Sequence, residues 1–462
     1  MLRNIISASV LILVAVSFTI AQQTPPEGGT PKPFNVPANE SYQLDNSMYV
    51  TLIPYGKIPK VTVRLMIQAG NVNESENQVW LADLTGNLLK EGTTSRNAEQ
   101  IAQEAASMGG SVDISTGLDQ STVNGDVLSE FAPDIIALIG DIVRNPLFPE
   151  SELARLKRDM VRNLSIQKSQ PQAVANEKFA EVLYGDHPYG RIFPTEEMVN
   201  GYTVDEIKQF YAENISAARS HLYVSGKFNT DQVKKAIKNA FNSWPKGKEA
   251  EMLPAKPRSE RAVYLIDRVD AKQSTIRMGL PVIDPSDPDY IKLQVTNSLL
   301  GGSLASRITS NIREDKGYTY SPRSSVTSRF RNAYWVQSAD VTTDVTGASL
   351  REIMKEINLL QAEPPANDEL KGIENYMAGI FVLRNSSRGG IISQLNYVDL
   401  HDLDEAYLKE YVDRVHAVTP EDVKNMTQKY IDDDKMIIVV AGDVKTIRQQ
   451  VKEFGKVYET LK

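Results

Sequence analysis

Hydrophobic and polar positions follow two different periods along the chain after residue 49. Residues 61–67, Val-Thr-Val-Arg-Leu-Met-Ile, place an apolar side chain at every second position, which is typical of a strand with one buried face. Leu153, Leu156, Met160 and Leu164 recur at spacings of three and four residues, so they share one face of an amphipathic helix. We therefore expect strands and helices to alternate along the chain.

Two stretches of the sequence repeat each other at a separation of 216 residues. Residues 203–208 and 419–424 both begin with a threonine and place acidic residues in the next turn, which predicts a capped helix start. In both copies an apolar strand ending in glycine follows at the same distance, at residues 222–226 and 438–442, so the two copies align without a gap. The repeat indicates an internal duplication. We expect an α+β fold of two homologous domains, each a largely antiparallel sheet covered by helices on one face.

The N-terminus has the features of a secretory signal. Arg3 precedes an apolar run from Ile5 to Ile20, and small residues occur at the positions before a cut after Ala21. The run is shorter than a typical membrane-spanning helix of about 20 residues, so we expect cleavage rather than a retained anchor. This predicts a periplasmic or secreted protein that meets the membrane only during export.

Proline, glycine and polar clusters divide the rest of the chain. Residues 22–41 lack a hydrophobic period, and a proline-punctuated, charged stretch begins at Pro245. The predicted segments are a signal peptide at 1–21, a flexible tether at 22–41, an N-terminal domain at 42–244, a linker at 245–261 and a C-terminal domain at 262–462.

Composition narrows the possible functions. A hydrophobic fraction of 41% and a charged fraction of 24% are those of an ordinary globular protein. The formal charge of −8 gives no support for nucleic-acid binding, which normally needs a basic face. The chain has no cysteine, which excludes disulfides, thiolate metal sites and a lipid-modified N-terminal cysteine.

The order of motifs in the first half is specific enough to resemble a known family. The motifs are Gln68-Ala69-Gly70-Asn71, the predicted helix 80–89, Lys90-Glu91-Gly92-Thr93, Gly109-Gly110-Ser111, Asp119-Gln120-Ser121-Thr122 and Asp186-His187-Pro188-Tyr189-Gly190. Over about residues 45–460 the chain resembles the M16 metallopeptidases, which include the mitochondrial processing peptidase, insulin-degrading enzyme and pitrilysin. The resemblance implies the two-domain M16 architecture.

The same resemblance locates the residues of a zinc site. Active members carry His-x-x-Glu-His on the helix before the Gly-Thr pair, with two zinc-binding histidines, a water-activating glutamate and a further glutamate from a later helix. Counted from Gly92-Thr93, the histidine positions hold Asp83 and Asn87 and the base position holds Gly86. The distal glutamate position holds Asn163.

These residues cannot build the family's metal centre. One carboxylate does not supply the three protein ligands of a catalytic zinc site, and glycine has no group that takes a proton from water. The four histidines never occur four residues apart, so no shifted motif replaces the lost one. We expect no metal or other cofactor in this chain, a structural or surface role for His187, and a solvated turn rather than a calcium site at Asp432-Asp433-Asp434.

A second family feature is present in the C-terminal half. Residues 310–321, Ser-Asn-Ile-Arg-Glu-Asp-Lys-Gly-Tyr-Thr-Tyr-Ser, resemble the segment that carries an Arg–Tyr pair in M16 enzymes. The resemblance implies that Arg313 and Tyr320 contact bound peptide. The alternative is that Arg313 pairs with Glu314 or Asp315 on an exposed helix while Tyr320 belongs to the core.

The chain lacks the zinc-binding residues but has a segment that resembles the family's Arg–Tyr segment. This combination resembles the inactive chain of two-chain M16 peptidases. The sequence thus predicts a non-catalytic subunit that positions peptide for a partner bearing the intact motif and zinc, with residues 109–122 forming either a peptide-pairing edge strand or an ordinary sheet edge. Two alternatives stay open, a purely structural or scaffolding protein and an enzyme that uses other residues. The sequence identifies neither the partner nor the substrate.

Overall fold

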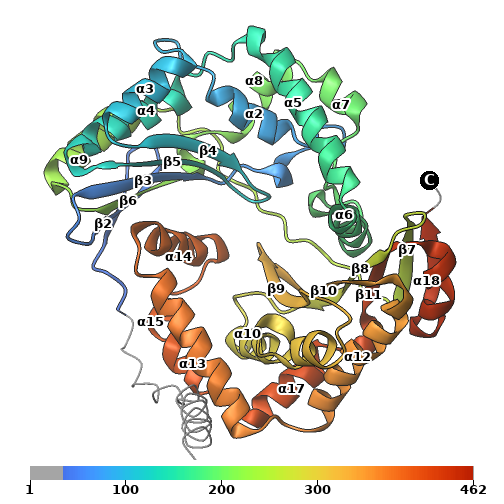
Figure 1. Cartoon of the computed structure of the whole chain (residues 1–462). Coiled ribbons are helices and arrows are strands. Elements are labelled where there is room, and N and C mark those ends of the chain that lie inside the picture. Colours follow the sequence, from blue (N-terminus) through green and yellow to red (C-terminus); the bar gives the residue numbers. More distant parts are fainter. Residues whose placement is uncertain (1–34, 461–462) are drawn as a thin grey trace, which may run out of the picture. The chain divides into compact units, whose positions relative to one another are not determined.

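The computed structural model describes residues 35–460, so the expected signal peptide and most of the expected tether lie outside the described residues. Two six-stranded sheets form the framework (Figure 1). The first contains β1 (Glu40–Gln43), β2 (Tyr49–Pro54), β3 (Lys60–Ile67), β4 (Ser111–Thr116), β5 (Ser121–Leu128) and β6 (Ser220–Gly226). The second contains β7 (Ala262–Asp267), β8 (Gln273–Val282), β9 (Arg323–Arg329), β10 (Asn332–Thr342), β11 (Ile437–Gly442) and β12 (Lys456–Thr460).

The helices fall into two groups that follow the same order as the sheets. In the first half they are α2 (Leu81–Leu89), α3 (Ala98–Ser107), α4 (Ala132–Arg144), α5 (Glu150–Ser169), α6 (Pro171–Tyr184), α7 (Glu196–Gly201), α8 (Val204–Asn214) and α9 (Thr230–Phe241). In the second half they are α10 (Tyr290–Asn297), α11 (Arg307–Thr309), α12 (Thr346–Ala362), α13 (Asn367–Arg384), α14 (Arg388–His401), α15 (Ala406–Lys409), α16 (Tyr411–His416), α17 (Pro420–Tyr430) and α18 (Val444–Val451). None of the described helices is both long and apolar enough to cross a membrane.

Strand order is the same in the two sheets and confirms the predicted fold class. The orders are β1-β2-β6-β3-β5-β4 and β12-β7-β11-β8-β10-β9. Most neighbours are antiparallel, and the parallel pairs are β2 with β6, β7 with β11 and β7 with β12. One outer strand differs in origin, because β1 precedes β2 and runs antiparallel to it whereas β12 comes from the end of the chain. The other outer strands are β4 and β9, so the segment 109–122 does contain an edge strand.

The local sequence signals lead to the expected elements. The apolar positions of α5 are its buried residues, Leu153, Leu156, Met160 and Leu164. Thr203 and Thr419 each accept a hydrogen bond from the backbone N–H three residues on, so both repeated helices begin with a capping box. The strands predicted at 222–226 and 438–442 lie within β6 and β11.

Each sheet is covered by helices on both faces, which differs from the prediction. Helices such as α3 and α4 lie along one face of the first sheet, as expected (Figure 1). The other face, however, receives a helix from the opposite half: α6 packs against β8 and β11, and α14 packs against β3 and β6. The expectation of helices on one face only was therefore wrong. Each half supplies a helix that packs on the sheet of the other half.

Candidate functional site: the degenerate metal centre and the Arg–Tyr pair

Helix α2 presents the positions where the family carries its zinc motif. It starts at Leu81, directly after Trp80, which adopts a left-handed backbone conformation with φ of 69°. Asp83 and Asn87 lie one turn apart on this helix and are partly buried, while Gly86 is buried. Asn163 lies on α5, which packs against α2, but its side chain is exposed.

A hydrogen-bonded cluster occupies the first of these positions. Asn71 Nδ2 donates to Asp83 Oδ2 at 2.7 Å and to Glu74 Oε1 at 3.1 Å, so one amide joins two carboxyl groups. The same Glu74 side chain accepts from the backbone N–H groups of Trp80 at 3.1 Å and Ala82 at 2.8 Å. Glu74 thereby caps the start of α2 and fixes its first turn.

Both carboxyl groups in this cluster resist ionisation. Burial raises the pKa of Glu74 to about 8, although hydrogen bonds from Ala82 and Asn71 work in the opposite direction. Burial also raises the pKa of Asp83, against the lowering effect of Asn71. Their partners are neutral donors rather than cations. A carboxyl group binds zinc in its ionised form, so the environment of Asp83 opposes the role that its position would require.

The surroundings of Gly86 would have to shift to admit the family's catalytic base. A Cβ added to Gly86 would lie 2.7 Å from Thr116 Oγ1 on β4, closer than non-bonded atoms approach. Thr116 is itself held by a hydrogen bond from its hydroxyl to the carbonyl of Ala82 at 3.3 Å. A glutamate at residue 86 would have to displace that strand or its side chain. The residues present therefore do not fit zinc, and residues 35–460 contain no group of three or more His, Cys, Asp or Glu side chains that could hold a metal.

The structure brings Arg313 and Tyr320 together. Arg313 lies in the π-helical turn Ser310–Asp315, and its guanidinium carbon is 4.9 Å from the centroid of the Tyr320 ring. Gly317 allows the reversal between them, since its φ of +64° is unfavourable for other residues. The tyrosine is 82% exposed, so the alternative that placed Tyr320 in the core is wrong.

Arg313 also forms an ion pair with Glu314, as the alternative interpretation predicted. Its Nε lies 3.1 Å from Glu314 Oε1, and the arginine side chain is 29% exposed. An ion pair at such exposure contributes little, about 0–1 kcal/mol, so it leaves the guanidinium available for a stronger acceptor.

The other candidate groups have structural partners. His187 caps a short 3-10 turn by accepting from the N–H of Tyr189 at 3.2 Å. In the acidic run, Asp432 pairs with Lys435 at 2.9 Å and Asp434 pairs with Arg261 at 2.5 Å. The carboxylates of this run therefore pair with cations of the chain itself.

Two features of the site escaped the sequence. Glu74 carries no motif signal, and only its burial reveals its altered acidity. The second is a cavity in the C-terminal half, where five of the chain's 19 tyrosines gather from different elements. A high local number of tyrosines between residues 376 and 411 was the only available hint.

Two duplicated α+β halves, with a helix that carries Asp, Gly and Asn at the zinc positions, define a metallopeptidase-like protein without the metal centre. The chain belongs to the M16 peptidase family. A profile described as Insulinase (Peptidase family M16) matches residues 50–194, and one described as Peptidase M16 inactive domain matches residues 201–377. Together these two profiles of one family match more than half of the chain.

Similar proteins carry names of both kinds, peptidase and non-peptidase. An uncharacterised zinc protease of Rickettsia bellii is 25% identical over 71% of this chain and 79% of its own length. A non-peptidase homologue from Helicobacter pylori is 24% identical over 78% of this chain and 87% of its own. A crystal structure of a peptidase M16 inactive domain from Pseudomonas fluorescens, 23% identical, superposes with a TM-score of 0.81 over 88% of this chain and 98% of that chain. With the unfit zinc positions, these findings support a non-catalytic M16 homologue.

Proposed function

We propose that this chain is the non-catalytic subunit of an exported heterodimeric M16 zinc peptidase. It helps to enclose the chamber and positions peptide through Arg313 and Tyr320, while a partner with an intact His-x-x-Glu-His motif holds zinc and performs the hydrolysis. The observation that carries the proposal is the contrast between the two features of the site. The zinc positions are filled with residues that do not fit the metal, whereas the guanidinium of Arg313 lies over the ring of the exposed Tyr320.

The chemistry of the pair suits a peptide. A guanidinium donates two parallel hydrogen bonds to a carbonyl or carboxylate, and a phenol donates one to an oxygen that gains negative charge. The edge strand β4 adds a second surface, because among residues 35–460 it pairs only with β5, and its other edge suits an extended peptide. Backbone pairing of this kind tolerates many sequences, which is useful for a subunit that holds peptides without cutting them.

The test is reconstitution. The full mature chain alone should bind less than stoichiometric zinc and cleave no peptide, and mixing it with an M16 chain that carries the intact motif should give peptidase activity. In the mixture, Arg313→Ala should lower kcat/KM by about ten- to a hundredfold and Tyr320→Phe by up to about tenfold, since charge-assisted hydrogen bonds contribute about 1.5–3 kcal/mol.

Lys316→Gln is the matched control, because it removes a positive charge from the same turn without touching the pair. If both pair variants match the wild type while the complex remains assembled, the positioning role is wrong.

A structural or scaffolding role is the second candidate. The Arg313–Glu314 ion pair favours it, because that contact gives Arg313 a partner within the chain. If this role is right, the complex assembles in the same experiment and Arg313→Ala has the same activity as the wild type.

A further inference from the structure

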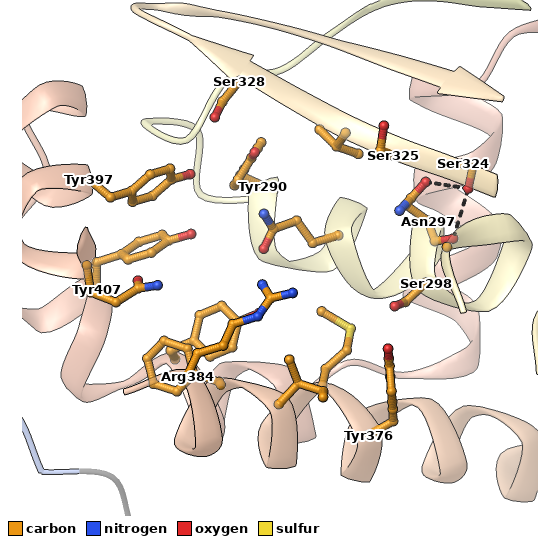
Figure 2. Close-up of a pocket in the computed structure, with 18 of the residues that line it drawn as sticks. Tyr290, Asn297, Ser298, Ser324, Ser325, Ser328, Tyr376, Arg384, Tyr397 and Tyr407 are labelled. Atoms are coloured by element: carbon orange, nitrogen blue, oxygen red, sulfur yellow. Dashed lines mark hydrogen bonds between the residues drawn. The ribbon is translucent and has the colours of Figure 1, made fainter. Parts of the chain in front are cut away.

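The second half contains a polar cavity, partly open to solvent, that the proposed function does not use. Its volume is about 360 Å³, and its walls come from α10, the following π-helical turn Ser298–Gly302, β9, α13, α14 and the segment that contains Tyr407 and Tyr411 (Figure 2). That volume is near the lower end of the range for small-ligand sites, about 300–1,000 Å³.

The charged groups around the cavity are all of one sign. Arg323 and Arg384 line it, and no aspartate or glutamate is among its lining residues in the described part of the chain. Within residues 35–460 neither guanidinium forms an ion pair. Figure 2 shows the guanidinium of Arg384 directed into the cavity, which Tyr397 and Tyr407 also line. An acidic protein of net charge −8 thus contains a local site that favours an anion.

The hydroxyl groups stay protonated and therefore remain donors. Burial raises the pKa of Tyr411 to about 12 and raises the pKa values of Tyr290, Tyr397 and Tyr407 as well. Tyr290 is 1% exposed and Tyr407 is 8% exposed, so both donors are fixed deep in the wall. On the opposite side Ser324 donates to Asn297 Oδ1 at 2.7 Å, which orients that amide.

One wall is apolar. Met377 and Ile380 of α13 and Val326 of β9 line the same space as the arginines. A ligand complementary to this arrangement has an anionic end for the guanidinium and hydroxyl groups and an apolar group for the hydrophobic wall. A planar carboxylate matches the two parallel donors of a guanidinium.

We propose that this cavity binds a carboxylate attached to a small apolar group, with Arg384 as its principal anchor. Such a carboxylate is found at the C-terminus of a peptide and in free small organic acids, and both present the same chemistry to the site. The proposal concerns the isolated chain and holds whether or not the chain works beside a peptidase partner.

Calorimetric titration of the full chain near neutral pH tests it with three probes. N-acetyl-Leu-Phe has a free carboxylate, its C-terminal amide has none, and 3-phenylpropanoate has the carboxylate without the peptide. The free acid of the dipeptide should bind at least about tenfold more tightly than the amide, because the charge-assisted bonds are lost in the amide. Equal binding by 3-phenylpropanoate identifies a free acid as a sufficient ligand, and much weaker binding identifies a peptide terminus. Equal affinities of acid and amide, or no binding of either acid at millimolar concentration, would overturn the proposal.

Variants locate the site. Arg384→Gln should weaken binding of the acid about ten- to a hundredfold and leave the melting temperature nearly unchanged, since this side chain is exposed at one end of α13. Arg331→Gln is the matched control, because Arg331 pairs with Asp402 outside the cavity lining and its loss should not change affinity. Unchanged affinity in Arg384→Gln would refute the assignment even if the acid binds elsewhere.

Discussion

Helices α6 and α14 occupy equivalent places in the two halves, yet they are held by different chemistry. Both are 14 residues long, and each packs on the sheet of the opposite half. Helix α6 contributes Phe179, Leu183 and Tyr184 to a buried apolar cluster that includes Val336 and Val439 of the second sheet. Its contact is an ordinary hydrophobic core.

Helix α14 meets the first sheet with many polar contacts, besides a buried apolar cluster that its isoleucines share with Ile53 of β2. Arg388 donates to Thr62 Oγ1 at 3.1 Å and to Asp126 Oδ2 at 3.0 Å, and Arg64 donates to Ser393 Oγ at 3.0 Å. Tyr223 of β6 also hydrogen-bonds to a carboxylate of α14. Most of these side chains keep some exposure to water.

The difference indicates where the contact between the halves is strong. Burial of apolar area contributes about 25 cal/mol per Å², whereas a hydrogen bond exchanged with water contributes a net of only about 0.5–1.5 kcal/mol. We therefore expect α6 to carry most of the stability of the contact between the halves. Helix α14 is the side that opens at lower free energy.

The largest effect is expected at α6. Phe179 is 1% exposed and lies 5.6 Å, centroid to centroid, from the ring of Tyr334, so Phe179→Ala should destabilise the protein by about 3–5 kcal/mol. Asn396→Ala on α14 is the matched comparison. It removes one hydrogen bond of 2.9 Å to Gln120 and should cost about 1 kcal/mol. Urea unfolding monitored by circular dichroism measures both. Equal losses would show that the two contacts do not differ in the way their chemistry indicates.

The two halves also differ in how they treat charge. In the N-terminal half, the position of the family's metal centre holds buried carboxyl groups whose pKa values are raised, and the C-terminal half keeps two unpaired arginines around a cavity among the described residues. The first case gives a pH-dependent stability that can be isolated. The pKa of Glu74 is raised from an ordinary value of 4.5 to about 8 in the folded protein. Between these values the folded state binds more protons than the unfolded state, so stability falls as pH rises.

Glu74→Gln should flatten this dependence. Between pH 5 and pH 8 the wild type should lose on the order of 2–4 kcal/mol of unfolding free energy that the variant does not lose. Glu76→Gln is the control, because Glu76 lies exposed in the same loop and should leave the wild-type slope intact. Unfolding by urea at four pH values measures the slopes. Parallel curves for the wild type and Glu74→Gln would show that Glu74 ionises normally.

The sequence predicted the elements well because their signals are local. The apolar period of α5 and the threonine caps of α8 and α17 depend only on neighbouring residues, and the structure confirms each of them. What covers a strand is not local. The alternation puts Thr62 and Arg64 on the more polar face of β3, and the structure shows that α14, more than 300 residues away in the chain, covers that face. A period of two identifies which residues share a face and says nothing of the partner of that face.

The site shows the same division. Counting from Gly92-Thr93 placed the degenerate positions on α2, because a motif is a property of spacing along one helix. The acidity of Glu74 and the cavity around Arg384 depend on burial by elements distant in the sequence. Neither property has a pattern in the residues themselves.

The smallest effect is expected from Arg388→Gln on α14. At neutral pH Asp126 is ionised, because hydrogen bonds from Thr62, Arg388 and Lys60 outweigh burial and hold its pKa below the ordinary value of 3.8. The ion pairs of Asp126 therefore stabilise the protein above a pH of about 3.8, and this stabilisation is lost as the pH falls through the lower pKa that Asp126 has in the folded state. Lys60 at 3.2 Å still pairs with Asp126 in the variant, so the loss should be only about 1 kcal/mol.

We expect amide exchange in α14 to become about fivefold faster at pH 7, with α6 unchanged. Arg414→Gln, which breaks an exposed pair on α16, is the control and should change neither helix. Faster exchange in α6 as well would show that the two contacts open together, and the proposed difference between them would then fail.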